Sequence, residues 1–231
     1  MSRFVDLTHR VQERVRESMT QNENQVFMGI ALFMGALIGL VVAGFIVATE
    51  GLQSLLFPED VERWRRLVTP ILGTITAGYL LSYFFPEARG SGVPQTKAAM
   101  FARQGLIPMR TVFGKFLCSW ITLGSGIALG REGPSVQIGA GLSSSLGRAL
   151  GLTAERIQML VPIGAAAAMA AAFNTPLAAI LFDLEEIIGN LHAPILGSAV
   201  VSVFTSLFVM RLLLGNEPLF HVPEYQAVHP A

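Results

Sequence analysis

An arginine and a glutamate lie side by side in an otherwise uncharged, glycine-rich stretch of this chain. The stretch is LGSGIALGREGPSVQIGAG, residues 123–141, and the pair is Arg131 and Glu132. At a water-exposed turn such a pair would need no explanation. Inside a membrane it would be costly, and ionisable groups there usually line an ion or proton pathway. The chemistry open to the pair therefore depends on the solvent that surrounds the chain.

Three short breaks, each made of small or polar residues and a proline, interrupt the apolar sequence after residue 89. They are GSGVP at 90–94, GREGP at 130–134 and NTP at 174–176. Proline suits the first turn of a helix, so each break predicts a helix start, with Ser91, Asn174 and Thr175 as expected N-caps. Helix starts carry partial positive charge, and several that converge would form an anion site. Broken helices also bind cations through their C-terminal ends, which is the alternative.

Long uncharged segments must position these breaks. Residues 26–49, 67–86, 157–182 and 193–210 contain no Asp, Glu, Lys or Arg. About 20 apolar residues span a bilayer core. The 231-residue chain is 52% hydrophobic and only 14% charged, against about 25% charged in an average soluble domain. The sequence therefore predicts an all-α, polytopic membrane protein, and a soluble, fully buried helical bundle is the alternative.

The pattern divides the chain into three regions. Residues 1–25 combine arginines with apolar residues near helical spacing, which predicts a cytoplasmic amphipathic helix at the membrane surface or a solvated leader helix. Residues 26–215 form the membrane domain, and residues 216–231 form a polar tail. The net charge is zero, so we expect no nucleic-acid partner. The single cysteine, Cys118, excludes a disulfide framework and a cysteine metal cluster, and we expect no metal and no cofactor.

Three further polar residues lie near the breaks. Lys115 is flanked by apolar residues, and a lysine in such a place usually pairs with an acid or reaches an interface. Lys97 follows GSGVP, where it either attracts anions to a cytoplasmic mouth or is an ordinary solvated charge. Gln95 follows the proline of the same motif.

The three breaks, in this order and separation, resemble those of the CLC family of chloride channels and chloride/proton antiporters. The resemblance rests on GSGVP, on GREGP and on AAFNTPLAAILFDLEE at 171–186, and it extends over residues 24–215. It implies the broken and tilted helices of the first inverted repeat of a CLC-type core. Many relatives have an acid where this chain has Gln95.

The resemblance also implies roles for single residues. Ser91 matches the serine whose hydroxyl contacts the central chloride. The other expected anion-binding residues are Gly92, Val93, Gly130, Arg131 and Gly133. Glu132 matches the gating glutamate, whose carboxylate competes with chloride until it is protonated and swings aside. For Arg131, structural pairing is the alternative to ion binding.

Proton coupling is implied by a second acid. Glu186 matches the internal proton-transfer glutamate of the antiporters, and a shift of one residue would give this role to Glu185. For these acids a water-exposed helix end is the alternative. The resemblance favours chloride/proton exchange over a passive, voltage- or pH-gated chloride channel. Ser91 favours chloride or nitrate over fluoride.

The resemblance covers only the first half of the family's core. The second-half G-x-F-x-P motif and the later chloride-contacting tyrosine do not occur up to residue 231. We therefore expect the site to need a C-terminal half. A truncated gene or incomplete chain, a second polypeptide and the antiparallel pairing of two copies are the three explanations. The complete protein is expected to be a homodimer in the cell (inner) membrane. A non-transporting fragment that only dimerises with a full-length relative is the alternative.

An intramembrane serine hydrolase is the enzymatic alternative, with Ser91 or Ser125 as the nucleophile. A serine nucleophile needs a base beside it. The four histidines, His9, His192, His221 and His229, lie outside the apolar spans or at their ends. We therefore expect that the chain is not an enzyme.

Overall fold

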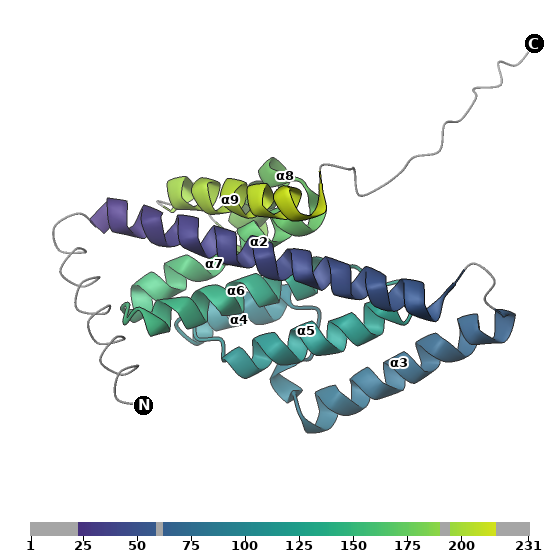
Figure 1. Cartoon of the computed structure of the whole chain (residues 1–231). Helices are drawn as coiled ribbons and strands as arrows, with labels where there is room; N and C mark the ends of the chain where they lie inside the picture. Colours follow the sequence, from purple (N-terminus) through teal and green to yellow (C-terminus); the bar gives the residue numbers. More distant parts are fainter. Residues whose placement is uncertain (1–22, 59–61, 190–194, 216–231) are drawn as a thin grey trace, which may run out of the picture.

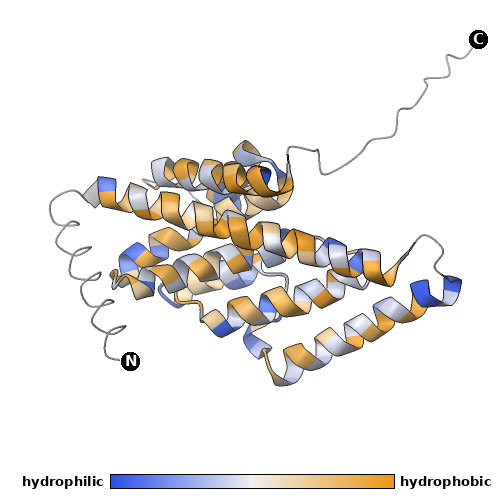
Figure 2. Cartoon of the chain, in the orientation of Figure 1, coloured by the Kyte–Doolittle hydropathy of each residue, from blue (hydrophilic) through white to orange (hydrophobic). Residues whose placement is uncertain are grey.

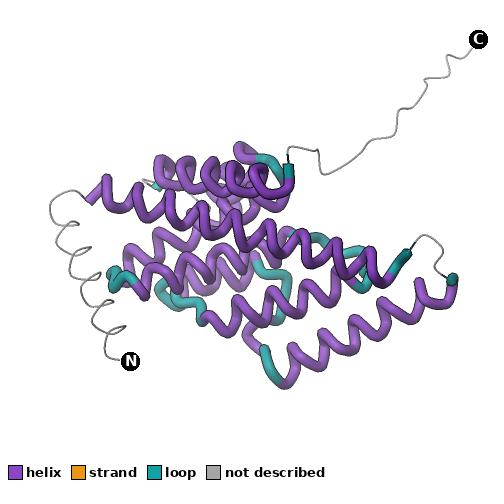
Figure 3. Tube along the Cα trace, viewed as in Figure 1, coloured by secondary structure: helices purple, strands orange, loops and turns teal. Residues whose placement is uncertain are grey.

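Helices make up most of the chain. The computed structural model describes residues 23–58, 62–189 and 195–215, and within these ranges it contains no strand (Figure 3). The longer helices are α2 (Glu23–Leu56), α3 (Arg63–Tyr83), α5 (Met109–Gly124), α6 (Glu132–Ala149), α7 (Ala154–Phe173) and α9 (Leu196–Leu214). The shorter ones are a 3-10 helix (Pro86–Ala88), α4 (Val93–Ala102), α8 (Pro176–Phe182) and the π-helical turn Asp183–Ile188.

The longer helices pack around α7. On one side α7 contacts α6, and on the other it contacts α2 and α9, which lie side by side (Figure 1). α5 packs between α3 and α6, so that α3 lies at the edge of the bundle (Figure 1). The main core is built from buried apolar side chains of α2, α6, α7 and α9. The short helix α4 lies against α6, next to the region where the candidate site is found.

Small residues allow the helices to approach closely. A Cβ atom added to Gly35 or Gly39 of α2 would overlap the backbone of Ser202 or Ser206 of α9. A Cβ atom added to Gly139 of α6 would likewise overlap the backbone of α7. Such contacts are typical of helices that pack within a membrane, where van der Waals contact replaces the hydrophobic effect.

Three of the described helices are long and apolar enough to cross a bilayer. They are Gln25–Leu56, Ala154–Phe173 and Leu196–Leu214. Large apolar side chains also remain exposed on the outer helices, including Phe33 on α2, Ile75 on α3 and Phe208 on α9, and the apolar colouring covers much of the bundle (Figure 2). Such faces are stable in contact with lipid, whereas their exposure to water would be unfavourable. The predicted all-α, polytopic membrane fold is confirmed.

All three predicted breaks lie at helix starts. α4 begins at Val93, α6 at Glu132 and α8 at Pro176. The N-cap of α4, however, is Gly92 and not Ser91. The φ angle of Gly92 is +121°, which glycine adopts far more readily than any other residue. Its N–H donates a hydrogen bond of 2.8 Å to Oε1 of Gln95. The side chain of Gln95 therefore caps the start of α4, where the sequence predicts the side chain of Ser91.

The break at 174–176 is used differently from the prediction. Asn174 is the C-cap of α7 and not an N-cap, with a left-handed φ of +57° that asparagine tolerates. Its Oδ1 accepts hydrogen bonds from Nε and Nη2 of Arg211, at 2.9 and 2.6 Å. Thr175 is the N-cap of α8, as predicted, although its side chain makes no capping hydrogen bond.

Two of the three predicted regions lie almost wholly outside the described residues. These are the amphipathic helix at 1–25, of which only the last residues fall in α2, and the tail at 216–231. All four histidines also lie outside the described residues.

Candidate functional site

The loops that precede α4 and α6 touch each other through their backbones. A Cβ atom added to Gly92 would overlap the carbonyl oxygen of Gly133, and one added to Gly133 would overlap the carbonyl oxygen of Ser91. A larger residue at either glycine would push the loops apart. The starts of α4 and α6 therefore lie next to each other, whereas α8 packs against α7 and α9. Two of the three predicted helix starts converge.

The two loops line a cavity of about 480 Å³, which we call the site cavity. Its predicted site residues are Ser91, Gly130, Glu132 and Gly133. Further walls come from α3 and α5. Ser91 and Glu132 are exposed in this chain, so a hydroxyl and a carboxyl group both belong to the lining of the cavity. Gly92, Val93 and Arg131 are not among its lining residues.

Lys115 of α5 also lines the site cavity, and it holds the loop before α4 in place. Its Nζ donates hydrogen bonds to the carbonyl oxygens of Ala88, at 3.2 Å, and Gly90, at 2.6 Å. The residue is only 4% exposed, and its partners are carbonyl groups where an acid is the usual partner. Neither ion pair found among the described residues involves this ammonium, so it adds positive potential to the cavity that Glu132 also lines.

The sequence predicts an acid or an interface as the partner of Lys115, and the structure instead gives it two carbonyl groups of the loop before α4. A buried lysine with no acid nearby in sequence was the available signal. Its partners could not be deduced, because the contact joins α5 to a segment 25 residues earlier.

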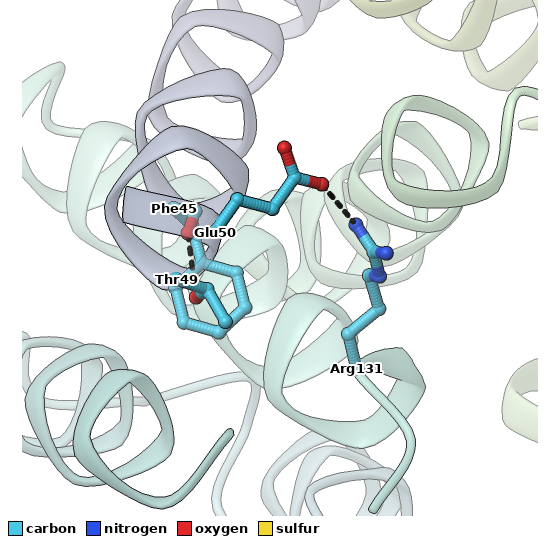
Figure 4. Close-up of polar contacts among 4 residues, drawn as sticks. All are labelled: Phe45, Thr49, Glu50 and Arg131. Atoms are coloured by element: carbon cyan, nitrogen blue, oxygen red, sulfur yellow. Dashed lines mark hydrogen bonds and ion pairs between the residues drawn. The ribbon is translucent and has the colours of Figure 1, made fainter. Parts of the chain in front are cut away.

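Arg131 points away from the site cavity. Its Nη1 lies 4.0 Å from Oε1 of Glu50, near the end of α2 (Figure 4). The two side chains line another cavity of about 400 Å³, and Leu129 lines both cavities. Along the loop, Gly130 and Glu132 thus line the site cavity while Arg131 lies on the other side. This geometry corresponds to the structural alternative for Arg131.

Glu186 lies beside the helix that follows the GSGVP motif. Its Oε1 is 3.7 Å from Nζ of Lys97 on α4, and the two side chains are about half exposed. Glu185 is exposed as well. The π-helical turn that carries both acids packs against α4 and α7. Of the two alternatives, Glu186 is therefore the acid in contact with the helix that starts at the candidate site.

Comparison with known proteins identifies relatives of this chain. The family described as voltage gated chloride channel matches residues 73–231. The H+/Cl− exchange transporter ClcA of Salmonella schwarzengrund (strain CVM19633) is 32% identical over 225 residues, which cover 92% of this chain. ClcA of Yersinia pestis bv. Antiqua (strain Angola) is 34% identical over 223 residues, which cover 90% of the chain.

Solved structures show the same fold. The crystal structure of a slow cyanobacterial Cl−/H+ antiporter has a TM-score of 0.73 at 25% identity and covers 83% of this chain. That of a CLC-type fluoride/proton antiporter has a TM-score of 0.73 at 27% identity and covers 87%. This chain accounts for 48% and 50% of those two structures, and 48% of the Salmonella relative and 46% of the Yersinia one. The chain thus spans about half the length of the proteins it matches.

Proposed function

Because the chain belongs to the voltage gated chloride channel family, we propose that it supplies one half of an ion path that exchanges chloride for protons across a membrane. The observation that carries the proposal is the backbone contact between Gly92 and Gly133. This contact places Ser91 and Glu132 on one cavity at two adjacent helix starts. The Salmonella and Yersinia relatives, which are H+/Cl− exchange transporters, and the cyanobacterial Cl−/H+ antiporter support chloride and protons as the ions.

In this proposal, chloride binds in the site cavity. The hydroxyl of Ser91 and the N–H groups of Glu132 and Gly133 at the start of α6 donate hydrogen bonds to it. Partial charges from helix starts attract an anion less strongly than a full counter-charge would, so the ion can leave again. The ammonium of Lys115 adds positive potential from the wall of the cavity. Two of its three N–H groups already donate hydrogen bonds to the carbonyl oxygens of Ala88 and Gly90. We therefore assign it to the field and not to direct ligation.

Glu132 acts as the gate. As a carboxylate it is itself an anion at the start of α6, so it competes with chloride for the same partial charges. Protonation removes that competition and frees the cavity. Chloride movement then requires proton uptake at Glu132, which links the two fluxes.

Glu186 passes protons to and from the cytoplasmic side. Its ion pair with Lys97 of α4 supports this assignment over Glu185, which has no ion pair among the described residues. We further propose that a C-terminal half completes the site, that the complete protein is a homodimer, and that it resides in the cell membrane.

The test is a flux measurement in liposomes. Chloride efflux and proton movement are recorded together for the chain alone and for the chain coexpressed with the C-terminal half of a relative such as ClcA. We expect coupled fluxes from the completed protein, and chloride flux without proton movement in its Glu132→Ala variant. Chloride efflux without protons in the unmodified protein would indicate a channel. No chloride flux in the completed protein would contradict the proposal as a whole.

A further inference from the structure

A smaller cavity lies behind the loop that carries Ser91. Its volume is about 250 Å³, and it runs along one flank of α4 between the 3-10 helix, the start of α5 and α6. We call it the α4 cavity. Residues 86–91 separate it from the site cavity: Glu87 and Arg89 face the α4 cavity, while Ala88, Gly90 and Ser91 face the site cavity.

The wall between the two cavities is held from both sides by α5. Lys115 bonds to the carbonyl oxygens of Ala88 and Gly90 on the side of the site cavity. One turn earlier, Oγ1 of Thr111 donates a hydrogen bond of 3.0 Å to Oε2 of Glu87 on the side of the α4 cavity. The two cavities are therefore separate compartments, and an ion in one does not occupy the other.

The charges around the α4 cavity favour an anion. Its ionisable lining residues are Glu87, Arg89 and Arg103, which gives a formal charge of +1. The carboxylate of Glu87 is already engaged by Thr111. Arg89 donates to the carbonyl oxygens of Leu81 and Ser82. The guanidinium of Arg103 makes no hydrogen bond and no ion pair with any residue that the structure describes, so its donors remain available.

Gln137 requires that a ligand of the α4 cavity donate a hydrogen bond, whereas Arg103 requires that it accept one. This α6 residue lines the α4 cavity and is only 2% exposed, and its Oε1 has no hydrogen-bond partner among the described residues. A buried amide oxygen without a donor is costly. A ligand that satisfies both groups must accept hydrogen bonds from Arg103 and donate one to Gln137. A halide or nitrate ion can only accept.

We propose that the α4 cavity is a second anion site, distinct from the site cavity, that binds a small monovalent oxyanion bearing a proton, such as bicarbonate. The O–H of the ion donates to Oε1 of Gln137, and its charged oxygens accept from the guanidinium of Arg103. The volume suits this class, because it lies below the roughly 300–1,000 Å³ typical of sites for larger organic ligands. The proposal is independent of the transport activity proposed above.

Bicarbonate and nitrate are a matched pair of probes, since both are planar, singly charged oxyanions and only bicarbonate carries an O–H. The purified chain in lipid nanodiscs is titrated with each ion at constant ionic strength, and Tm is recorded. We expect bicarbonate to raise Tm saturably, by about 5 °C at a hundredfold excess over its Kd, and nitrate to raise it much less. Arg103→Gln, an exposed change, should weaken bicarbonate at least about tenfold.

Three further variants locate the effect. Gln137→Met should remove the preference for bicarbonate over nitrate. Ser91→Ala, in the site cavity, and Arg110→Gln, an equal change of charge outside the α4 cavity, should leave the bicarbonate response intact. The proposal is overturned if nitrate stabilises the Ser91→Ala variant, whose site cavity lacks the hydroxyl, as well as bicarbonate does. It is also overturned if Arg103→Gln responds normally, or if Ser91→Ala loses the response.

Discussion

The Nζ of Lys115 lies 2.6 Å from the carbonyl oxygen of Gly90, so a buried cation holds the loop that carries Ser91. The same cation lines the cavity that contains Glu132. One residue of α5 therefore fixes the shape of the candidate site and sets its electrostatic potential. These two contributions can be separated by substitution.

Replacing Lys115 tests this double role. Lys115→Met removes both hydrogen bonds and the charge, and we expect chloride flux in the completed protein to fall by about 10- to 100-fold, because a hydrogen bond to a charged group contributes about 1.5–3 kcal/mol. Lys115→Arg keeps the charge in a different shape and should retain more flux than the methionine variant. Equal flux in all three proteins, measured in liposomes, would exclude both contributions.

Gly133 allows the loops before α4 and α6 to touch. In Gly133→Ala the new methyl group overlaps the Ser91 carbonyl, so we expect a loss of about 1–3 kcal/mol in the free energy of unfolding, as for other overpacked sites. Gly44→Ala in α2, where a Cβ atom meets nothing within 4 Å, is the matched control and should be neutral or stabilising. Reversible unfolding in lipid measures both. A neutral Gly133→Ala would show that the loops do not pack as described.

The contact between Arg131 and Glu50 distinguishes pairing from ion binding. At 4.0 Å, with Arg131 30% and Glu50 62% exposed, a double-mutant cycle of Arg131→Gln and Glu50→Gln should give a coupling energy below about 1 kcal/mol. The apparent affinity for chloride should change little and to a similar extent in both single variants. A large loss of chloride affinity in Arg131→Gln alone would instead assign Arg131 to the ion.

The two acids of the π-helical turn provide a controlled pair for proton coupling. Under the proposed function, Glu186→Gln should retain chloride flux and lose most proton movement, because the glutamine cannot carry a proton. Glu185→Gln, a change of equal size and charge at the adjacent residue, should keep both fluxes. Simultaneous recording of chloride and protons gives the ratio directly. The reverse pattern would move the role to Glu185.

Sequence reasoning identified the elements better than their caps. The uncharged segments predicted α2, α3, α7 and α9, and the proline-containing breaks predicted the starts of α4, α6 and α8, since both signals are local. Neither signal predicted α5. Ser91 and Asn174 were assigned as N-caps because their side chains suit that role. At these two breaks, however, the capping residues are Gly92 and Asn174, which adopt a positive φ, and the need for that conformation depends on where the flanking helices point.

In the candidate site, too, the residues of the local motifs were predicted and the contacts between distant segments were not. The motifs led to Ser91, Gly130, Glu132 and Gly133, which do share a cavity. The direction of Arg131 could not be deduced, because Glu50 lies 81 positions earlier and only the packing of α2 brings the two together. The α4 cavity was equally hidden, since Arg103 follows the end of α4, Gln137 lies on α6, and the two share no motif.

The packing of α2 against α9 has a consequence for the order in which the protein matures. The close-contact glycines of α2, Gly35 and Gly39, meet Ser202 and Ser206, more than 160 residues later in the chain. During synthesis α2 therefore enters the bilayer long before its partner exists. Its small-residue face contacts lipid until α9 has been made. Assembly of the bundle is thus completed only when the chain has been synthesised through α9. In a nascent chain that stops before that helix, the face of α2 that carries Gly35 and Gly39 lacks its partner.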